Sequence, residues 1–100
     1  MLDMANLKTI APMGAYAPSA FDAFRAFDAA PLADGAVPRK YKELIAFSVA
    51  LPTQCDYCLE VHRKAALAAG AISDEIAETV FAAAALRAGA AVTHGTHLVA

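Results

Sequence analysis

Alanine is the feature of this sequence that most restricts its fold. Alanine occupies 27 of the 100 positions, and it has the highest intrinsic helix propensity of the common residues. Valine, isoleucine and threonine, which favour strands, together number only 15. Hydrophobic residues make up 59% of the chain and charged residues 18%, which excludes a disordered chain. The sequence therefore predicts one all-α domain over residues 1–100, with about four to six helices.

Prolines, glycines and capping residues divide the chain into expected segments. Residues 1–17 contain a proline and a glycine and show no steady period, so we expect them to be mostly extended. Helices are expected from 18 to the turn at 31–35, from 38 to 52, from about 55 to 69, and from 73 onward with a break at Gly89 or Gly95. Ser73 is expected to cap the last helix and Gly70 to end the one before it. Three phenylalanines at helical spacing are expected in the core: Phe21, Phe24 and Phe27.

The charge pattern argues against several partners and compartments. The formal net charge is −2 and no Lys/Arg cluster occurs, so we expect no nucleic-acid partner and no anionic membrane surface. The start of the chain has neither a basic segment nor an apolar run typical of a signal peptide. The apolar run 44–51 is too short to span a bilayer, and Arg87 and Gly89 interrupt the run 81–92. These features predict a cytoplasmic protein, where a static structural disulfide is disfavoured.

The small share of charged residues also predicts that the chain associates with other copies of itself. Small domains carry roughly 25–35% charged residues on their surface, whereas the whole chain here has 18%. A 100-residue monomer leaves roughly a third of its unfolded surface exposed, and much of that surface would be apolar. Large exposed apolar surfaces mark partner interfaces. We therefore expect an obligate homo-oligomer.

Two cysteines and a histidine fall on one face of the third expected helix. The segment reads Cys55-Asp-Tyr-Cys58-Leu-Glu-Val-His62, and offsets of three, four and seven residues share a helix face. Glu60 and Lys64 lie on the other side, at ion-pair spacing. Both thiols and the imidazole are therefore expected to point in the same direction.

A helix face that carries two thiols and an imidazole favours a reactive cysteine. A helix N-terminus and a neighbouring imidazolium both favour the thiolate, which is the nucleophilic form of cysteine. His62 lies one turn after Cys58, so its imidazole can take the Cys58 proton. The resulting thiolate can attack an O–O or S–S bond, and Cys55 can then close a disulfide.

Other interpretations of these residues remain open at this point. The cysteines could be small buried hydrophobes beside a satisfied histidine. Cys55, Cys58 and His62 could bind zinc, with His94 or His97 as a fourth ligand. Glu43, twelve residues before Cys55, could simply be an early-helix charge favoured by the dipole.

Together, these residues resemble a known signature. Glu43, Cys55-x-x-Cys58 and His62 occur at the spacing of the alkylhydroperoxidase D-like branch of the carboxymuconolactone decarboxylase family. The flanking segments DGAVPRKYKELIAFSVAL and AALRAGAAVTH look similar too, so the resemblance covers about residues 20–97. It implies an all-helical fold assembled into trimers or hexamers.

The resemblance also implies roles for the site residues. Cys58 would be the peroxidatic thiol that attacks a hydroperoxide, and Cys55 the resolving thiol. His62 would be the base, with Glu43 relaying protons to it. No bound cofactor or metal is implied; an external dithiol, lipoyl or thioredoxin-like, would reduce the enzyme. The candidate accessory residues are Tyr57 and His94.

This sequence departs from the family pattern at one position. Peroxidase members carry a second histidine between the cysteines, where this chain has Tyr57, and a phenol is a poorer base than imidazole at pH 7. Three functions stay open: a thiol-dependent peroxidase or general thiol-disulfide oxidoreductase, a decarboxylase-like lyase using His62 and Glu43, and a metal-binding or structural oligomer.

Overall fold

The structure is a computed structural model that describes residues 3–99. Within that range it contains helices and no strand, which confirms the all-α prediction. The chain divides into two compact units, Met1–Arg39 and Lys40–Ala100. The helices are η1 (Met4–Thr9), α1 (Ile10–Gly14), α2 (Pro18–Ala29), η2 (Ala30–Leu32), α3 (Arg39–Thr53), α4 (Asp56–Ala68) and α5 (Ser73–Val99).

The first unit differs from the sequence prediction at its start. Residues 4–14 are helical rather than extended, because the Asp3 carboxylate accepts the Ala5 N–H at 2.9 Å and caps η1. Pro12 lies in the first turn of α1, where a backbone N–H has no helical partner to lose. Local capping therefore outweighs the proline that suggested an extended chain.

The three phenylalanines of α2 do not share one core. Phe21 is half-buried and its ring lies against Gly14, where an added Cβ would overlap the ring. Phe24 and Phe27 are 59% and 75% exposed, so their prediction as core residues is wrong. Helical spacing identified an apolar face correctly, but only its first residue is covered within this unit.

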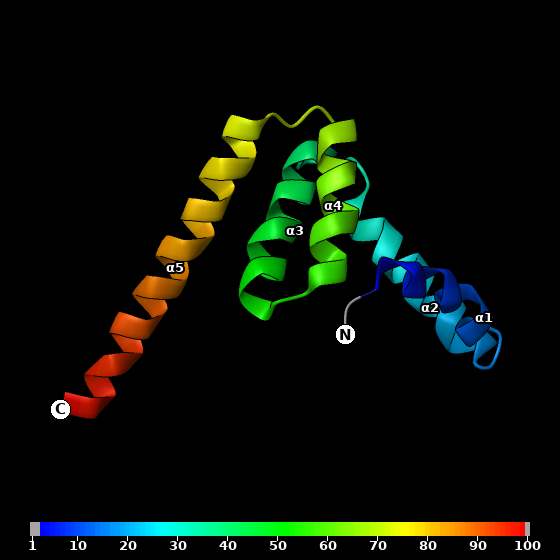
Figure 1. Ribbon diagram of the computed structural model, residues 1–100, viewed down its shortest axis with the longest axis horizontal. Helices are drawn as coiled ribbons and strands as arrows, with labels where there is room; N and C mark the ends of the chain where they lie inside the picture. The colour runs from blue at the N-terminus through cyan, green and yellow to red at the C-terminus, as the bar shows by residue number, and fades with distance from the viewer. Residues whose placement is uncertain (1–2, 100) are drawn as a thin grey trace. The chain divides into compact units, whose positions relative to one another are not determined.

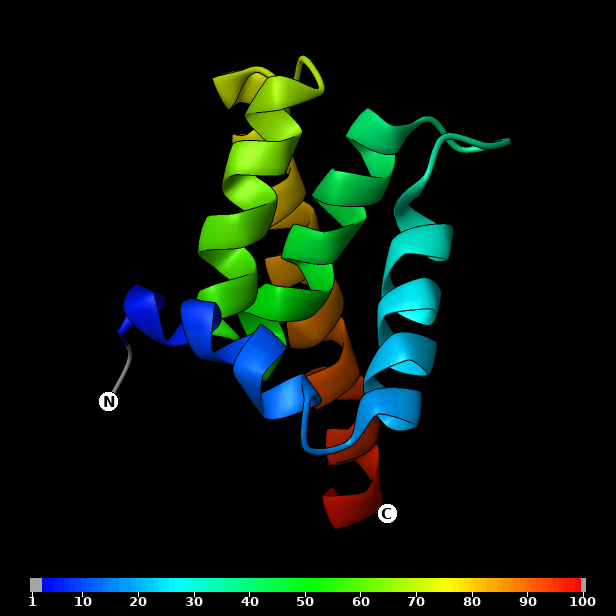
Figure 2. The same ribbon diagram turned by 90° about the vertical axis from the view of Figure 1, so that its right-hand side faces the viewer.

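In the second unit, α3 and α4 lie side by side and antiparallel, as Figures 1 and 2 both show. The buried residues between them form one cluster, to which α5 adds Ile76 through its first turns. The members are Leu44, Phe47, Ala66 and Ala71, with Leu59 and Ile76 packed against them. This small core holds the two helices that carry the candidate site.

Helix α4 ends as the sequence predicts. Gly70 has a φ of +95°, a left-handed conformation that favours glycine. The Ala71 N–H donates to Ala66 O at 2.9 Å and the Gly70 N–H to Leu67 O at 3.1 Å, the two bonds of a Schellman motif. Because Ala66 and Ala71 both belong to the core, this cap also turns the chain toward α5.

The start of α5 is held by Glu75 rather than by the predicted cap Ser73. The Ile72 N–H donates to Glu75 Oε1 at 3.0 Å, and Lys40 Nζ on α3 lies 3.0 Å from Glu75 Oε2. The Lys40 hydrogen bond, and after it the Ile72 N–H, lowers the pKa of Glu75. One carboxylate therefore caps α5 and links it to α3.

These contacts predict an acid-sensitive contribution to stability. A lowered folded-state pKa stabilises the native state above the ordinary glutamate pKa, and this contribution is lost as the pH falls through the folded value. We expect Glu75→Gln to flatten the decrease in unfolding free energy between pH 7 and about pH 3, measured by urea denaturation. Glu78→Gln on the same helix is the control. Equal acid dependence in both variants would contradict the assignment.

Helix α5 runs unbroken from residue 73 to 99, across the glycines at which a break was expected. Two glycines cost a helix about 1 kcal/mol each relative to alanine, and the surrounding alanines make that cost tolerable. Both views show its C-terminal half extending past the α3–α4 pair (Figures 1 and 2). By length and composition α5 is also apolar enough to cross a membrane, and Ala83 is its buried residue while most of its other side chains are exposed.

Candidate active site

The turn between α3 and α4 places Cys55 between the C-terminal end of α3 and the first residue of α4. The Cys55 N–H donates to Ala50 O at 3.0 Å and the Gln54 N–H to Leu51 O at 3.3 Å, which again makes a Schellman motif. Its left-handed residue is Gln54, with a φ of +57°, although glycine is the usual choice at this position. Cys55 is therefore hydrogen-bonded to α3 through its backbone.

Cys55 is also the N-cap of α4. Its Sγ accepts the Cys58 N–H at 3.3 Å, taking the place that an oxygen of serine or aspartate usually fills. The two sulfurs are joined in a disulfide, with the Cα atoms 5.2 Å apart. Both residues are half-buried. The pair thus lies at a helix N-terminus, where backbone N–H groups favour a thiolate once the bond is reduced.

His62 and Glu43 are joined across the α3–α4 contact. Nδ1 of His62 lies 2.6 Å from Oε2 of Glu43, and the two side chains are 21% and 2% exposed. If Glu43 is ionised its oxygen can only accept, and the proton of this contact is then assigned to Nδ1, which donates to Oε2. The other ring nitrogen, Nε2, is then the basic one.

The charged residues of α4 lie where the helix spacing predicts. Glu60 Oε1 is 3.7 Å from Lys64 Nζ, and Glu60 Oε2 is 3.5 Å from Arg63 Nε. Arg63 and Lys64 are exposed. These pairs form a solvated face and leave the disulfide and His62 on another part of α4.

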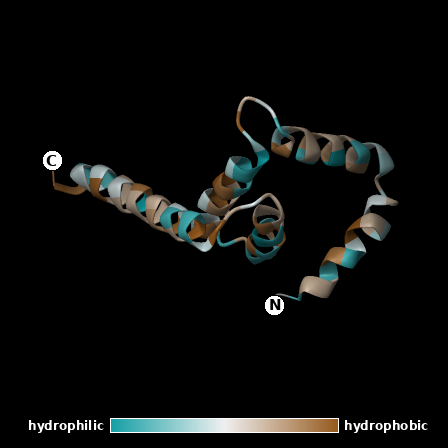
Figure 3. Ribbon diagram, turned by 90° about the horizontal axis from the view of Figure 1, so that it is seen from above, coloured by the Kyte–Doolittle hydropathy of each residue, from teal (hydrophilic) through white to brown (hydrophobic). Residues whose placement is uncertain are grey.

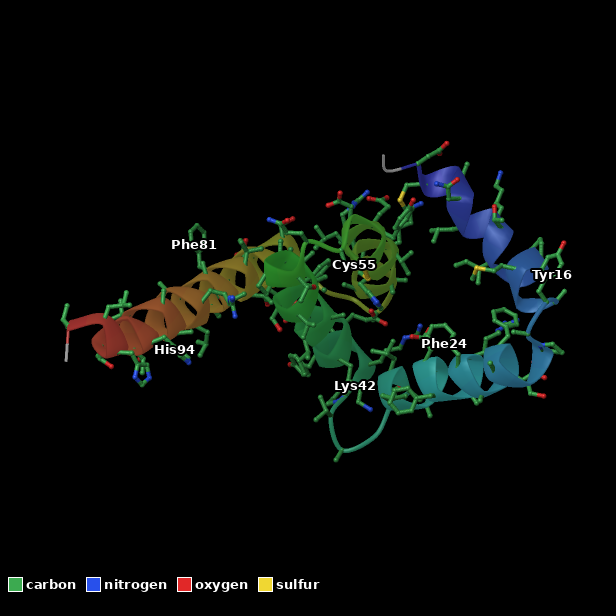
Figure 4. The ribbon with its side chains drawn as sticks, turned by 90° about the horizontal axis from the view of Figure 1, so that it is seen from below. Tyr16, Phe24, Lys42, Cys55, Phe81 and His94 are labelled. Atoms are coloured by element: carbon green, nitrogen blue, oxygen red, sulfur yellow. A yellow bond between two sulfur atoms is a disulfide. The ribbon has the colours of Figure 1, made fainter. Side chains whose placement is uncertain are left out.

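Of the remaining predicted site residues, one lies next to the cysteines in α4 and the histidines of α5 lie far from them. Tyr57 lies on α4 between the cysteines and is half-buried. His94 lies far along α5 from Cys55 (Figure 4), is exposed, and makes a 2.9 Å contact from Nδ1 to Ala90 O. Its ring is 6.4 Å from that of His97. The structure therefore does not bring His94 or His97 of the same chain to the cysteines.

The zinc alternative finds no support in this geometry. Residues 3–99 contain no group of three or more histidine, cysteine, aspartate or glutamate side chains that could hold a metal ion. In the disulfide state, moreover, the two sulfurs are bonded to each other, whereas a zinc site uses thiolates.

An open apolar pocket of about 210 Å³ lies between the C-terminal end of α3 and the middle of α5. Its lining is aliphatic apart from one guanidinium: Leu51, Pro52, Val80, Ala83, Ala84 and Arg87. It therefore offers no acid or base for chemistry.

Sequence reasoning missed Gln54. A left-handed backbone is expected at glycine and occasionally at asparagine or aspartate, and nothing about a glutamine predicts it. The available signal was indirect: a helix that runs to Pro52 and a second that begins at Asp56 leave only a tight turn between them.

Comparison with known proteins identifies relatives of this chain. The model of the carboxymuconolactone decarboxylase family matches residues 18–100. A Paracoccus denitrificans protein named "Uncharacterized protein 4 in cox locus" is 44% identical over 79 residues, which are 79% of this chain and 71% of that protein. An uncharacterized protein of Cupriavidus necator is 35% identical over 68 residues, 68% of this chain and 60% of that protein.

Proposed function

This chain belongs to the carboxymuconolactone decarboxylase family, and from that membership and its site we propose that it is a thiol-dependent peroxidase. Members of the family are generally enzymes, either lyases or peroxidases. The observation that carries the proposal is the 2.6 Å Glu43–His62 contact, with His62 four residues after the second cysteine of a pair that forms a disulfide. A base oriented by a buried carboxylate, on the same helix as the cysteine pair, fits peroxide reduction.

The reaction begins at Cys58. Nε2 of His62 takes the proton of the Cys58 thiol, and the thiolate attacks the terminal oxygen of a hydroperoxide. The O–O bond breaks, Cys58 becomes a sulfenic acid, and the imidazolium returns the proton to the departing alkoxide to give an alcohol. Glu43 stabilises the imidazolium through the Nδ1–H bond, as a carboxylate does for a histidine base.

Cys55 completes the oxidation. Its sulfur attacks the sulfenic sulfur of Cys58, the S–O bond breaks, and the hydroxide leaves with the thiol proton as water. The overall change is two thiols and one hydroperoxide to one disulfide, one alcohol and one water. An external dithiol, lipoyl or thioredoxin-like, then reduces the disulfide by two electrons, so no bound cofactor is needed.

A free-thiol count tests this proposal. Reduced protein is treated with one equivalent of cumene hydroperoxide, and thiols are counted over seconds to minutes. We expect the wild type to lose both thiols and Cys58→Ser to keep its single thiol far longer. Cys55→Ser should react as fast as the wild type but stop at a sulfenic acid, which a dimedone adduct would reveal by mass spectrometry.

The outcomes separate the assignments. A different outcome is that the wild type loses both thiols while the Cys58→Ser thiol is oxidised quickly and the Cys55→Ser thiol slowly. That result would show that Cys55 attacks the hydroperoxide and Cys58 resolves the sulfenic acid. Wild-type thiols that persist unchanged would overturn the peroxidase proposal. Lyase activity that survives serine at both cysteines would favour the family's other chemistry through His62 and Glu43.

A general thiol-disulfide oxidoreductase is the second candidate. The observation that favours it is the placement of Cys55 Sγ at the N-cap of α4, where the Cys58 N–H stabilises negative charge on sulfur. For this function Cys55 would attack a disulfide of another molecule and Cys58 would release the mixed disulfide. Rapid exchange with oxidised glutathione by Cys58→Ser, together with no reaction with hydroperoxide, would favour this function.

A further inference from the structure

The apolar pocket between α3 and α5 has the size and lining of a site for a small organic molecule. Its volume is about 210 Å³, and five of its six lining residues are aliphatic. Ligand sites in proteins combine such a lining with a few polar groups. A cavity of about 150 Å³ with an aliphatic and aromatic lining is large enough to bind benzene. The pocket therefore has room for one ring with a small substituent, or for a short branched chain.

The sixth lining residue, Arg87, brings a positive charge to this pocket. Brown and pale shades of apolar and neutral residues recur along α5 (Figure 3), and Arg87 is the one fully charged residue between positions 79 and 99. The nearest carboxylate on the same helix, that of Glu78, is about 13 Å away along the axis. The opposite wall offers none, because residues 44–53 are uncharged. Within residues 3–99, Arg87 accordingly takes part in no ion pair.

The pocket lies beside the turn that carries the first cysteine. Leu51 forms part of its wall, and the Leu51 carbonyl oxygen accepts the Gln54 N–H at 3.3 Å. In the same turn the Cys55 N–H donates to Ala50 O at 3.0 Å. A molecule in the pocket therefore contacts the same end of α3 to which Cys55 is hydrogen-bonded.

We propose that this pocket binds the organic part of the substrate and that Arg87 selects substrates in which this part carries a carboxylate. The inference rests on the peroxidase function proposed above and names its substrate class: hydroperoxides of small aryl or branched aliphatic acids. The ring or chain fills the aliphatic lining, and the planar guanidinium donates two hydrogen bonds to the carboxylate. The carboxylate takes no part in the redox step, so it is unchanged in the alcohol product.

The charge of the pocket favours an organic acid over other small molecules. A cation would be repelled by Arg87. An uncharged hydroperoxide would cover part of the guanidinium without pairing with it, and burying an unpaired charge is unfavourable. An inorganic anion would leave the aliphatic lining in contact with water, so it would gain nothing from apolar burial. An organic acid satisfies both parts of the pocket.

Binding of an unreactive analogue tests the site apart from the redox chemistry. The probes are para-isopropylbenzoate and the corresponding benzyl alcohol, which share a ring and differ in charge. We expect the benzoate to shift the amide NMR signals of Leu51, Val80 and Ala84, and the alcohol to bind roughly tenfold more weakly. Arg87→Gln should bind both probes equally, whereas Arg63→Gln, which removes an exposed charge on α4, should keep the wild-type difference. Equal binding of both probes by the wild type would overturn the proposal.

A second pair of variants tests the pocket itself. Ala84 lines the pocket and is exposed, so Ala84→Phe fills the space without entering the core cluster. Ala82 is exposed on the same helix and lies outside the lining, so Ala82→Phe is the matched control. We expect Ala84→Phe to weaken binding of the benzoate by roughly tenfold or more, and Ala82→Phe to bind it as the wild type does. Equal affinity of the two variants would contradict the assignment of the pocket.

Rates of thiol oxidation test the substrate class. Reduced protein is mixed with cumene hydroperoxide or with its para-carboxylate derivative, and the second-order rate constant of thiol loss is measured by stopped flow. We expect the wild type to prefer the carboxylate roughly tenfold. This preference should decrease as the salt concentration is raised from about 20 mM to about 500 mM. Arg87→Gln should react equally with both hydroperoxides, and Arg87→Lys should keep part of the preference.

Failure of this inference can be distinguished from failure of the peroxidase function. Fast oxidation by both hydroperoxides with equal rate constants in the wild type would overturn the substrate class and leave the peroxidase function standing. Thiols that resist both hydroperoxides would overturn the peroxidase function, and the substrate class with it.

Discussion

Replacing Glu43 by glutamine is expected to slow the reaction of the reduced protein with an organic hydroperoxide by roughly 10²-fold. The amide oxygen can still accept the His62 Nδ1–H, so the ring keeps its orientation. The amide has no charge to stabilise the imidazolium that forms when Nε2 takes the Cys58 proton. The loss should therefore fall on the rate of thiol oxidation rather than on the fold.

Stopped-flow measurement of thiol loss, with a thermal melt of each protein, checks this expectation. Glu60→Gln is the matched control, because Glu60 is a carboxylate on α4 whose partners are Arg63 and Lys64. It should react within about twofold of the wild type. A Glu43→Gln protein that oxidises at the wild-type rate would show that the buried carboxylate serves stability alone.

The second large effect is on stability. Phe47 is 5% exposed and lies in the core cluster with Leu44 and Ala66. We expect Phe47→Ala to lower the free energy of unfolding by about 3–5 kcal/mol, since it removes buried apolar surface and leaves a cavity. A domain of this size has a stability of roughly 5–15 kcal/mol, so the loss is a large fraction of the total.

Urea denaturation followed by circular dichroism measures this change. Phe27→Ala is the control, because Phe27 is 75% exposed and the same truncation there should cost within about 0.5 kcal/mol. Similar losses at both positions would mean that the cluster around Phe47 is not the main core. Loss of hydroperoxide reactivity in Phe47→Ala at temperatures where it stays folded would place Phe47 in the support of the Glu43–His62 contact.

The parts of the site that lie on one helix could be predicted from spacing. Cys55 and Cys58, three residues apart, are joined in a disulfide, and Glu60 pairs with Lys64 as expected. Glu43 is different, because it is 19 residues from His62 and on another helix. Spacing alone left it an ordinary early-helix charge; the family resemblance connected it with the histidine.

The failures have a common physical origin. A periodic pattern identifies an apolar face without saying what covers it, which is why Phe24 and Phe27 were wrongly placed in the core. The helix at residues 4–14 depends on a capping contact from Asp3 that outweighs Pro12 and Gly14. Both cases are decided by particular contacts, which composition does not encode.

The turn at Gln54 has a consequence for the redox cycle. Cys55 is hydrogen-bonded to α3 through its N–H and caps α4 through its sulfur, while Cys58 belongs to the first turn of α4. Both cysteines therefore have hydrogen bonds or helical contacts besides the S–S bond that hold their positions. In the proposed reaction, a partner dithiol would approach a cysteine pair that is held between the ends of the same two helices before and after its reduction.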